Sequence, residues 1–317
     1  MLKLEKMIWG GNMQKKALEM AGIVMGIVAV VVMVCMMISY KDSDKTNIFT
    51  ARSNSEGLVI TGVMKNAEVG DELVFPDTIS GKKVVGISLY ASEYAKLAKN
   101  IEKIEVNTKI EKVDSKMFSS FINLKEIKLP DSVRIIEDGA FEFCEKLQKI
   151  NIDELDNLKE IGKNSLCNTQ WYKDSIKDKQ FLIKRDILIG VNVDTDRIEV
   201  PEGIKIIAKE AFASNDTVRE ILLPESVNSI NAGAFSKMSS LESIELPKNL
   251  QRIEYGTFSM CSNLSYVNTE ELLELTMIDE KAFYRCVNLY ITLPNNNIKI
   301  GKEAFRDTKG TTISNNN

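Results

Sequence analysis

The hydrophobic pattern of this chain repeats about every 23 residues. One large apolar side chain marks each repeat unit, and consecutive markers are separated by 23, 25, 46, 23, 23, 25 and 22 residues, of which 46 is two periods. The markers are Phe118, Phe141, Leu166, Phe212, Phe235, Phe258, Phe283 and Phe305. A fixed period of this length is typical of stacked units, none of which can bury its apolar face alone.

The positions around each marker predict the local structure. Apolar residues stand eight and five positions before it, such as Val227 and Ile230 before Phe235. Six positions after it, Leu241 opens the run LESIELP, in which the apolar Ile244 and Leu246 stand on either side of the polar Glu245. Alternation with period two predicts a short strand with one buried face. The proline cannot donate to a strand ladder, so it marks the next turn. We therefore expect a solenoid with an interior column of Phe, Ile and Leu.

Three segments depart from this pattern, namely the N-terminal residues before the repeats, the unit at 168–196 and the residues after 306. Residues 168–196 occupy the place of one unit, and we predict a variant coil built as a hairpin there. Two β-rich runs around Val59 and Val74, with Gly and Asp between them, predict a hairpin within an N-terminal capping region. The predicted domains are the capping region at 57–100, the solenoid at 101–306 and a polar tail at 307–317.

At these positions the chain resembles the BspA-like leucine-rich repeats of bacterial and some protist surface proteins. Their units read approximately LP-x-S-V-x-x-I-x-x-x-A-F-x-x-C-x-x-L-x-x-I, and the resemblance covers roughly residues 57–306. It departs at 158–166, where Leu166 replaces Phe, and at 268–278, where the LP pair is missing. The resemblance implies an α/β-type repeat solenoid, mainly β with short turns and helices. It also implies cell-surface display, binding or adhesion, and no catalytic residues.

A segment before the repeats has no polar positions. Residues 20–38 read MAGIVMGIVAVVVMVCMMI, 19 residues without a charge, which matches the hydrocarbon thickness of a bilayer. We predict a single transmembrane signal anchor at 17–40, uncleaved because no small-residue cleavage site follows. Lysines dominate the preceding flank, so residues 1–16 are expected in the cytoplasm and the C-terminal part outside the cell. Residues 41–56 are predicted as a polar linker.

Charge and composition exclude several functions. The chain of 317 residues has a formal net charge of −4, with +3 on residues 1–41, which leaves −7 on residues 42–317. An acidic body without a basic cluster argues against nucleic acid as a partner. Histidine is absent, which removes the commonest general base and metal ligand. We predict no cofactor and no metal site.

No catalytic motif stands out in the sequence. The chain has no GxxxxGK[ST], no GxSxG and no CxxC. Carboxylates are plentiful, so an Asp/Glu pair of a surface hydrolase stays an open alternative, although no residue is singled out. The best-supported expectation is that the protein is not an enzyme.

Three cysteines occupy the same position in their repeats. Cys144, Cys261 and Cys286 each stand three residues after a marker, where other units place mainly apolar side chains. Cys261 and Cys286, on adjacent coils, could come within disulfide range. Stacked coils direct their Cβ bonds in parallel, however, which favours buried free thiols. We expect a thiol ladder and leave a bridge open as the alternative.

Outward strand positions change character along the chain. In the first units Lys103, Glu126 and Lys149 alternate in sign, and ion pairs are expected along the ladder. The neighbouring outward column reads Glu105, Lys128, Asn151, Glu199, Leu222, Glu245, Asn268 and Thr292. Charged residues in these columns become fewer toward the C-terminus, where Leu222, Tyr266 and Tyr290 are expected to face outward. These three are our candidate ligand-binding residues.

The sequence therefore predicts a membrane-anchored cell-surface module that binds an extracellular protein or glycan without catalysis. A structural role within an envelope complex of the same cell is the alternative. A surface hydrolase is the third hypothesis.

Overall fold

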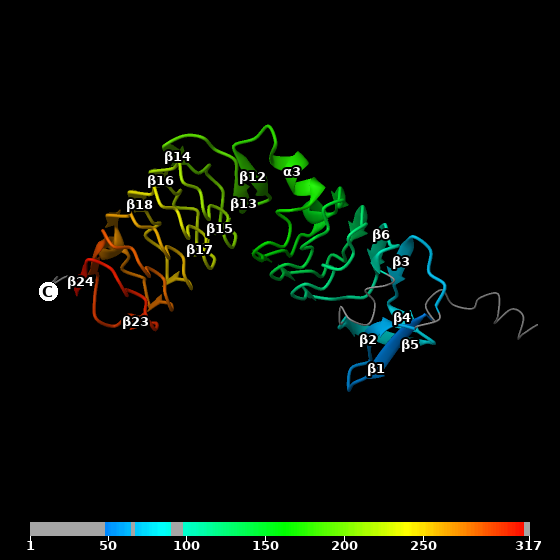
Figure 1. Ribbon diagram of the computed structural model, residues 1–317. Coiled ribbons are helices and arrows are strands. Elements are labelled where there is room, and N and C mark those ends of the chain that lie inside the picture. Colours follow the sequence, from blue (N-terminus) through cyan, green and yellow to red (C-terminus); the bar gives the residue numbers. More distant parts are fainter. Residues whose placement is uncertain (1–47, 65–66, 90–97, 314–317) are drawn as a thin grey trace, which may run out of the picture.

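The computed structural model describes residues 48–64, 67–89 and 98–313. They form a solenoid that curves as an arc from the region of β1–β5 at one end to β24 at the other (Figure 1). Each regular repeat unit supplies one strand to each of two stacks that run along the arc. The predicted repeat solenoid is confirmed.

The first stack consists of parallel strands that begin after each Leu of the repeat. Equivalent residues face each other, as in Ile104 opposite Ile127 and Ile221 opposite Ile244. The stack has two sheets, ordered β10-β8-β6-β3 and β14-β16-β18-β20. Their bounds are β3 (Glu72–Phe75), β6 (Lys103–Val106), β8 (Glu126–Lys128), β10 (Lys149–Ile150), β14 (Arg197–Glu199), β16 (Glu220–Leu222), β18 (Ser243–Glu245) and β20 (Tyr266–Val267).

The second stack uses the residue pair that ends five positions before each marker. Its strands are only two residues long and also parallel. They are β7 (Lys112–Val113), β9 (Ile135–Ile136), β11 (Glu160–Ile161), β15 (Ile206–Ile207), β17 (Ser229–Ile230), β19 (Arg252–Ile253), β21 (Met277–Ile278) and β23 (Lys299–Ile300). Figure 1 shows β14, β16 and β18 along the outer side of the arc and β15 and β17 along its inner side.

The marker side chains form the predicted interior column. Six of the seven Phe markers are fully buried, and Leu166 is buried as well. The ring centroids of Phe235 and Phe258 lie 5.3 Å apart, and those of Phe258 and Phe283 lie 5.2 Å apart. Phe305, the half-buried last marker, lies 5.8 Å from Phe283. The rings thus stack end to end along each regular part of the solenoid.

The turns that carry the markers are hydrogen-bonded to one another. The residue two positions before each marker has a positive φ, such as 67° at Gly233 and 60° at Gly256. This left-handed turn directs N–H groups toward the next coil. Phe235 N–H donates to the Thr257 carbonyl at 3.0 Å, and Gly233 N–H donates to the Tyr255 carbonyl at 2.9 Å. The turn column is therefore a ladder of its own, in addition to the two strand stacks.

The N-terminal region differs from the prediction. β1 (Phe49–Ser53) lies within the predicted linker 41–56 and pairs with β2 (Leu58–Val63) as an antiparallel hairpin. β2 also pairs with β5 (Lys82–Ile87), which carries β4 (Thr78–Ile79) on its other edge. The predicted pairing of the Val59 and Val74 runs is wrong. Val74 belongs to β3, whose buried Leu73 and Phe75 match Ile104 and Val106 of β6, so β3 is the first rung of the solenoid.

The variant coil is the predicted hairpin with an added helix. β12 (Phe181–Lys184) and β13 (Ile187–Val191) pair antiparallel, and β13 continues in parallel onto β15. The helix α3 (Gln170–Ile176) precedes them and was not predicted. It begins at Thr169, whose hydroxyl accepts a hydrogen bond from Tyr172 N–H, as an N-cap does.

The C-terminal end also contains structure that was not predicted. β22 (Tyr290–Leu293) pairs in parallel with β24 (Gly310–Ile313), which lies inside the predicted polar tail 307–317. The tail prediction is therefore wrong for these residues, because their backbone completes the ladder of β22. Two short 3-10 turns, η1 (Ile152–Glu154) and η2 (Thr269–Glu271), replace the LP turn in two of the units that lack it.

The predicted cytoplasmic segment 1–16 and signal anchor 17–40 lie outside the described residues. Within the described part of the chain, no helix has the length and apolar character needed to cross a membrane.

Candidate binding surface

Outward charges on the N-terminal units form the expected ion pairs. Lys149 Nζ lies 3.4 Å from a Glu126 carboxylate oxygen, and Lys128 Nζ lies 3.9 Å from Glu105. Lys103 pairs with Glu72 of β3 at 2.8 Å, and this hydrogen bond raises the Lys103 pKa. These pairs are exposed, so each contributes little to stability. This half of the outer stack is a self-compensated, solvated face.

Leu222 is separated from the two candidate tyrosines. It ends β16, half-buried, with Glu199 and Glu245 in register on either side. β18 lies between β16 and the strand that carries Tyr266. Leu222 therefore borders a charged column and is not part of one continuous apolar patch with Tyr266 and Tyr290.

Tyr266 and Tyr290 are both exposed at the C-terminal end of the outer stack. Their exposed fractions are 41% and 56%. Tyr266 stands in register with Ser243, and partial burial raises its pKa, with smaller contributions from Glu270 and other carboxylates. Their strands, β20 and β22, are neighbours. No ladder or ring contact joins the two tyrosines in the described part of the chain.

The position of Tyr290 depends on a close approach to glycine. β24 places Gly310 opposite Tyr290, and a Cβ atom built on Gly310 would lie 2.9 Å from ring atom Cε2. Any larger residue there would displace the ring. β24 therefore supports the outward orientation of Tyr290.

Two outward positions predicted from the strand period are wrong. The Asn268 side chain accepts from Leu246 N–H at 2.8 Å and donates to the Leu246 carbonyl at 3.0 Å. Asn151 makes the same pair of bonds to Leu129, at 2.8 and 2.9 Å. Both asparagines lie just after a strand of only two residues. Their amides continue the ladder where the backbone turns away, so neither is available to a ligand.

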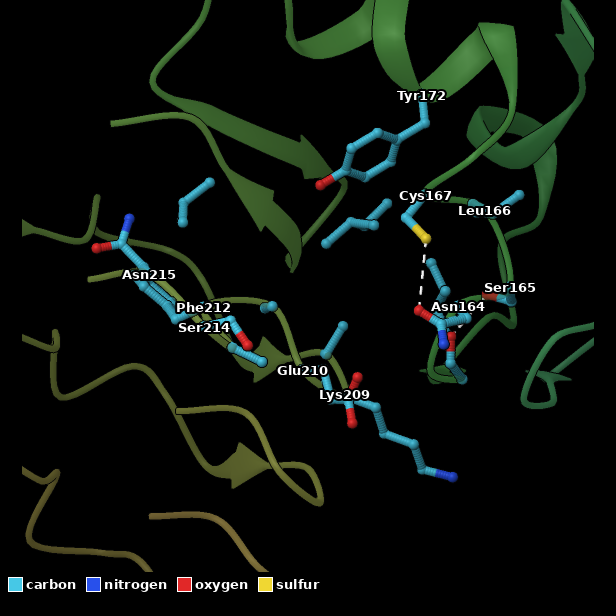
Figure 2. A pocket seen from close by; sticks show the side chains of 17 residues that line it. Asn164, Ser165, Leu166, Cys167, Tyr172, Lys209, Glu210, Phe212, Ser214 and Asn215 are labelled. Atoms are coloured by element: carbon cyan, nitrogen blue, oxygen red, sulfur yellow. Dashed lines mark hydrogen bonds between the residues drawn. The ribbon is translucent and has the colours of Figure 1, made fainter. Parts of the chain in front are cut away.

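A cleft lies beside the variant coil. It has a volume of about 460 Å³, and the turns of two coils form its walls, residues 162–167 on one side and 208–215 on the other. Figure 2 shows Tyr172 reaching into it from helix α3 and Cys167 directed toward Asn164, whose Oδ1 lies 3.6 Å from the sulfur. The sequence signals for this cleft are the double period and Leu166 in place of Phe. Neither was interpreted as a cavity.

The turn sequences agree with a known repeat family. The family described as BspA type leucine rich repeat region matches residues 88–195 and 183–312, in 6 copies. The chain belongs to this family. It departs from the BspA-type pattern at the variant coil, where the cleft is found.

Several solved structures are similar to this BspA-type chain. A leucine rich cell surface protein from Faecalibacterium prausnitzii is 17% identical, with a TM-score of 0.40 and coverage of 84% of this chain and 95% of the other. A leucine-rich repeat protein from Bacteroides ovatus is 23% identical, with a TM-score of 0.37 and coverage of 82% and 67%. The T. pallidum leucine-rich repeat protein is 21% identical, with a TM-score of 0.32 and coverage of 77% and 88%. No curated protein matches the sequence.

Three cysteines of the BspA-type repeats are buried free thiols, as expected. Cys144, Cys261 and Cys286 are buried and free. Each thiol donates to the carbonyl of a marker one coil earlier, for example Cys261 to Phe235 at 3.0 Å and Cys286 to Phe258 at 3.0 Å. Burial raises the pKa of Cys144 and of Cys261 to about 12. These thiols are therefore protonated at neutral pH and have a structural role.

The repeats contain one carboxyl group with a raised pKa among the described residues. Burial is the largest cause for this group, Glu254, which Asp279 also influences. Arg252 binds both oxygens of Asp279, at 2.8 and 2.9 Å, so this partner is not free to act as a nucleophile. Among residues 48–64, 67–89 and 98–313, no group of three or more Asp, Glu, Cys or His side chains could hold a metal ion.

Sequence reasoning missed a group of aromatic and cationic residues on the turn side. Lys281 lies over the Tyr255 ring at 5.9 Å, and Arg285 and Arg306 both lie over Tyr284, at 5.3 and 5.9 Å. The position directly after the marker holds Ser236, Ser259 and Tyr284 in consecutive units, so the repeat pattern contains no signal for this group. Their rings already have cationic partners, so they are weaker ligand candidates than Tyr266 and Tyr290.

Proposed function

We propose that this chain is a single-pass cell-surface protein whose leucine-rich repeats bind an extracellular protein or glycan without catalysis. The observation that carries the proposal is the exposure of Tyr266 and Tyr290 on neighbouring strands at the C-terminal end of the outer stack. Membership of the BspA-type family supports a binding role.

Tyrosine suits such a role for physical reasons. Its ring offers a large contact area and a hydroxyl, and it loses little rotamer freedom on binding. Tyrosine is enriched among residues whose truncation weakens interfaces. Two exposed rings on neighbouring strands provide a platform for a sugar ring or for an apolar side chain.

The membrane part of the proposal rests on sequence. The uncharged run at 20–38 within the anchor 17–40, with lysines before it, supports a cytoplasmic N-terminus and an extracellular C-terminal domain. The solenoid would then stand outside the cell at the end of a short connection.

Binding assays with the full chain in detergent test the proposal. We would probe arrays of glycans and of extracellular matrix proteins and, separately, identify proteins that co-purify from the membrane of the chain's own cell. Saturable binding to an array component, reduced by Tyr290→Ser but not by Lys149→Ser, supports it. Stoichiometric recovery with an envelope complex and no array binding would support the assembly role instead. Hydrolysis of an array glycan that is lost with one carboxylate would support a hydrolase.

A further inference from the structure

The cleft beside the variant coil is the space of one missing turn. In most regular coils the turn donates N–H groups from the positions at and two before the marker to the following turn, as Phe235 does to Thr257 at 3.0 Å and Gly233 does to Tyr255 at 2.9 Å. Phe141 likewise donates to Ser165 at 3.2 Å. The variant coil replaces its turn by α3 and a hairpin. The turn ladder is therefore interrupted between residues 162–167 and 208–215.

The interruption leaves complementary backbone groups on the two walls. On one wall, the N–H groups of Asn164 and Leu166 occupy the donor positions. On the other, the carbonyls of Lys209, Ala211 and Ala213 occupy the acceptor positions. None of these five groups has a hydrogen-bond partner in the described part of the chain, whereas most of the equivalent groups of the regular coils are paired, as at Gly233, Phe235 and Lys237. Open backbone edges of this kind are templates for another extended segment.

Aliphatic side chains replace the rings of the interior column at the same place, namely Leu166 and Ile189, which stands 23 residues from both Leu166 and Phe212 and is buried. No ring contact joins Phe141 to Phe212 in the described part of the chain, although rings on adjacent regular coils lie 5.1 to 5.8 Å apart. The cleft lining includes the apolar side chains of Leu166, Tyr172, Ile189, Val191 and Phe212, of which Tyr172 and Val191 are half-buried and the other three are buried. Its volume lies within the range of about 300–1,000 Å³ that is typical of ligand sites.

Ion pairs hold the two walls at a set distance. Lys163 Nζ of the first wall lies 2.7 Å from Glu210 of the second, and Lys209 Nζ lies 2.7 Å from Glu160. Lys209 is partly buried and also pairs with Asp138 at 3.4 Å. Because these bridges cross the gap, the cleft is already formed before a ligand arrives, which lowers the entropic cost of binding.

We propose that the cleft binds a short peptide segment of a partner protein, which takes the place of the missing turn. The carbonyls of the peptide accept from Asn164 and Leu166, and its N–H groups donate to Lys209, Ala211 and Ala213. One apolar side chain of the peptide packs against Tyr172 and Val191, the half-buried apolar side chains of the cleft lining. The peptide would pair with the two open edges of the turn ladder in the same way that an added strand pairs with the edge of a sheet. The proposal deepens the binding function proposed above, on which it rests, and it uses a different surface from Tyr266 and Tyr290.

A peptide fits this site better than a sugar or an anion. Only a polypeptide backbone presents N–H and carbonyl groups at the spacing of both walls. The cationic group at the rim, Lys209, already has two carboxylate partners, so it offers no free charge to a phosphate. The half-buried Tyr172 and Val191 offer a contact to one apolar side chain of the peptide.

A peptide copied from a regular turn of this chain is a direct probe. The fluorescent peptide SINAGAFSKM, which reproduces residues 229–238, would be titrated with the full chain in detergent micelles. We expect saturable binding in fluorescence anisotropy, with slower hydrogen exchange at Asn164 and Leu166. N-methylation at the peptide positions that match Gly233, Phe235 and Lys237 should weaken binding more than tenfold. N-methylation at the position that matches Met238, which takes no part in the ladder, should not.

A protein variant localises the probe. Cys167→Trp places a large ring at the half-exposed thiol that lines the cleft and should abolish binding, whereas Cys167→Ser should not. Absence of binding at millimolar peptide, or binding that Cys167→Trp and N-methylation leave unchanged, would overturn the proposal. Self-association of the chain that Cys167→Trp abolishes would also overturn it, since the occupant would then be a second copy. None of these outcomes affects the array test of Tyr290. Failure of this proposal can therefore be distinguished from failure of the proposed function.

Discussion

At the scale of single residues, burial decides which position of the repeat specifies the fold. The Phe markers could be identified from sequence because their spacing is regular and no other residue type recurs at that position. The structure buries Phe235 between Phe212 and Phe258, with centroids 5.1 and 5.3 Å away. Each ring therefore contributes both apolar burial and ring contacts on two sides.

Removing one ring tests this column. Phe235→Ala should lower the free energy of unfolding by about 3–5 kcal/mol, since truncation of a buried ring leaves a cavity. Phe305→Ala is the matched control and should cost less, because Phe305 is half-buried and has one ring neighbour. Urea unfolding followed by circular dichroism measures both. A loss below about 1 kcal/mol for Phe235→Ala would contradict its place in the core.

The buried thiols predict a dependence on alkaline pH. The pKa of Cys144 and of Cys261 is raised from about 9 to about 12, so the folded state retains protons that the unfolded state releases. The stability from these thiols is fully present below pH 9 and is lost as the pH rises toward 12. The free energy of unfolding should fall over this range. Cys144→Ala/Cys261→Ala should show a shallower fall, and an unchanged slope would contradict buried, protonated thiols.

At the scale of elements, sequence periodicity predicted strands well and their ends poorly. The variant coil at 168–196 was predicted because the 46-residue step between Leu166 and Phe212 equals two repeat periods. The strands that end at Ile150 and Val267 are only two residues long, so alternation placed Asn151 and Asn268 outward by extrapolation. Hydrogen bonds from the asparagine amides to the preceding coil determine the positions of these side chains instead. A two-residue period of apolar positions gives no information about such bonds.

The asparagine contacts should be important for stability. Asn268→Ala leaves the N–H and carbonyl of the buried Leu246 without partners, which should cost about 1–3 kcal/mol. Asn249→Ala, at an exposed position of the preceding turn, is the control and should change stability by less than about 0.5 kcal/mol. Thermal unfolding of both variants compares them. Equal melting temperatures would show that the Asn268 amide does not stabilise the ladder.

The candidate sites show the same limit of sequence reasoning. Exposure of Tyr266 and Tyr290 followed from the outward column, but the separation of Leu222 from them depends on strand order across the stack. The cleft was not predicted because its walls are backbone groups of coils about 46 residues apart in sequence. Only the structure shows which backbone N–H and carbonyl groups are left without hydrogen-bond partners when one turn is replaced.

At the scale of the whole molecule, we propose that a membrane anchor holds the solenoid outside the cell. With residues 1–16 in the cytoplasm and 17–40 as an uncleaved anchor, protease treatment of intact cells should digest the repeats and leave an N-terminal tag protected. Permeabilised cells are the control, in which the tag should also be lost. Secreted protein that begins near residue 40 would contradict an uncleaved anchor.

The central claim is that an exposed aromatic surface of the solenoid binds a ligand, and the double variant Tyr266→Ser/Tyr290→Ser tests it most directly. Once array screening has identified a ligand, its capture and the melting temperature of the chain should be measured together for wild type and variant. Both rings are exposed, so their loss should leave the melting temperature within a few degrees. The account predicts that capture is abolished while the melting temperature is retained. A lower melting temperature with capture intact would assign the tyrosines to packing and contradict the claim.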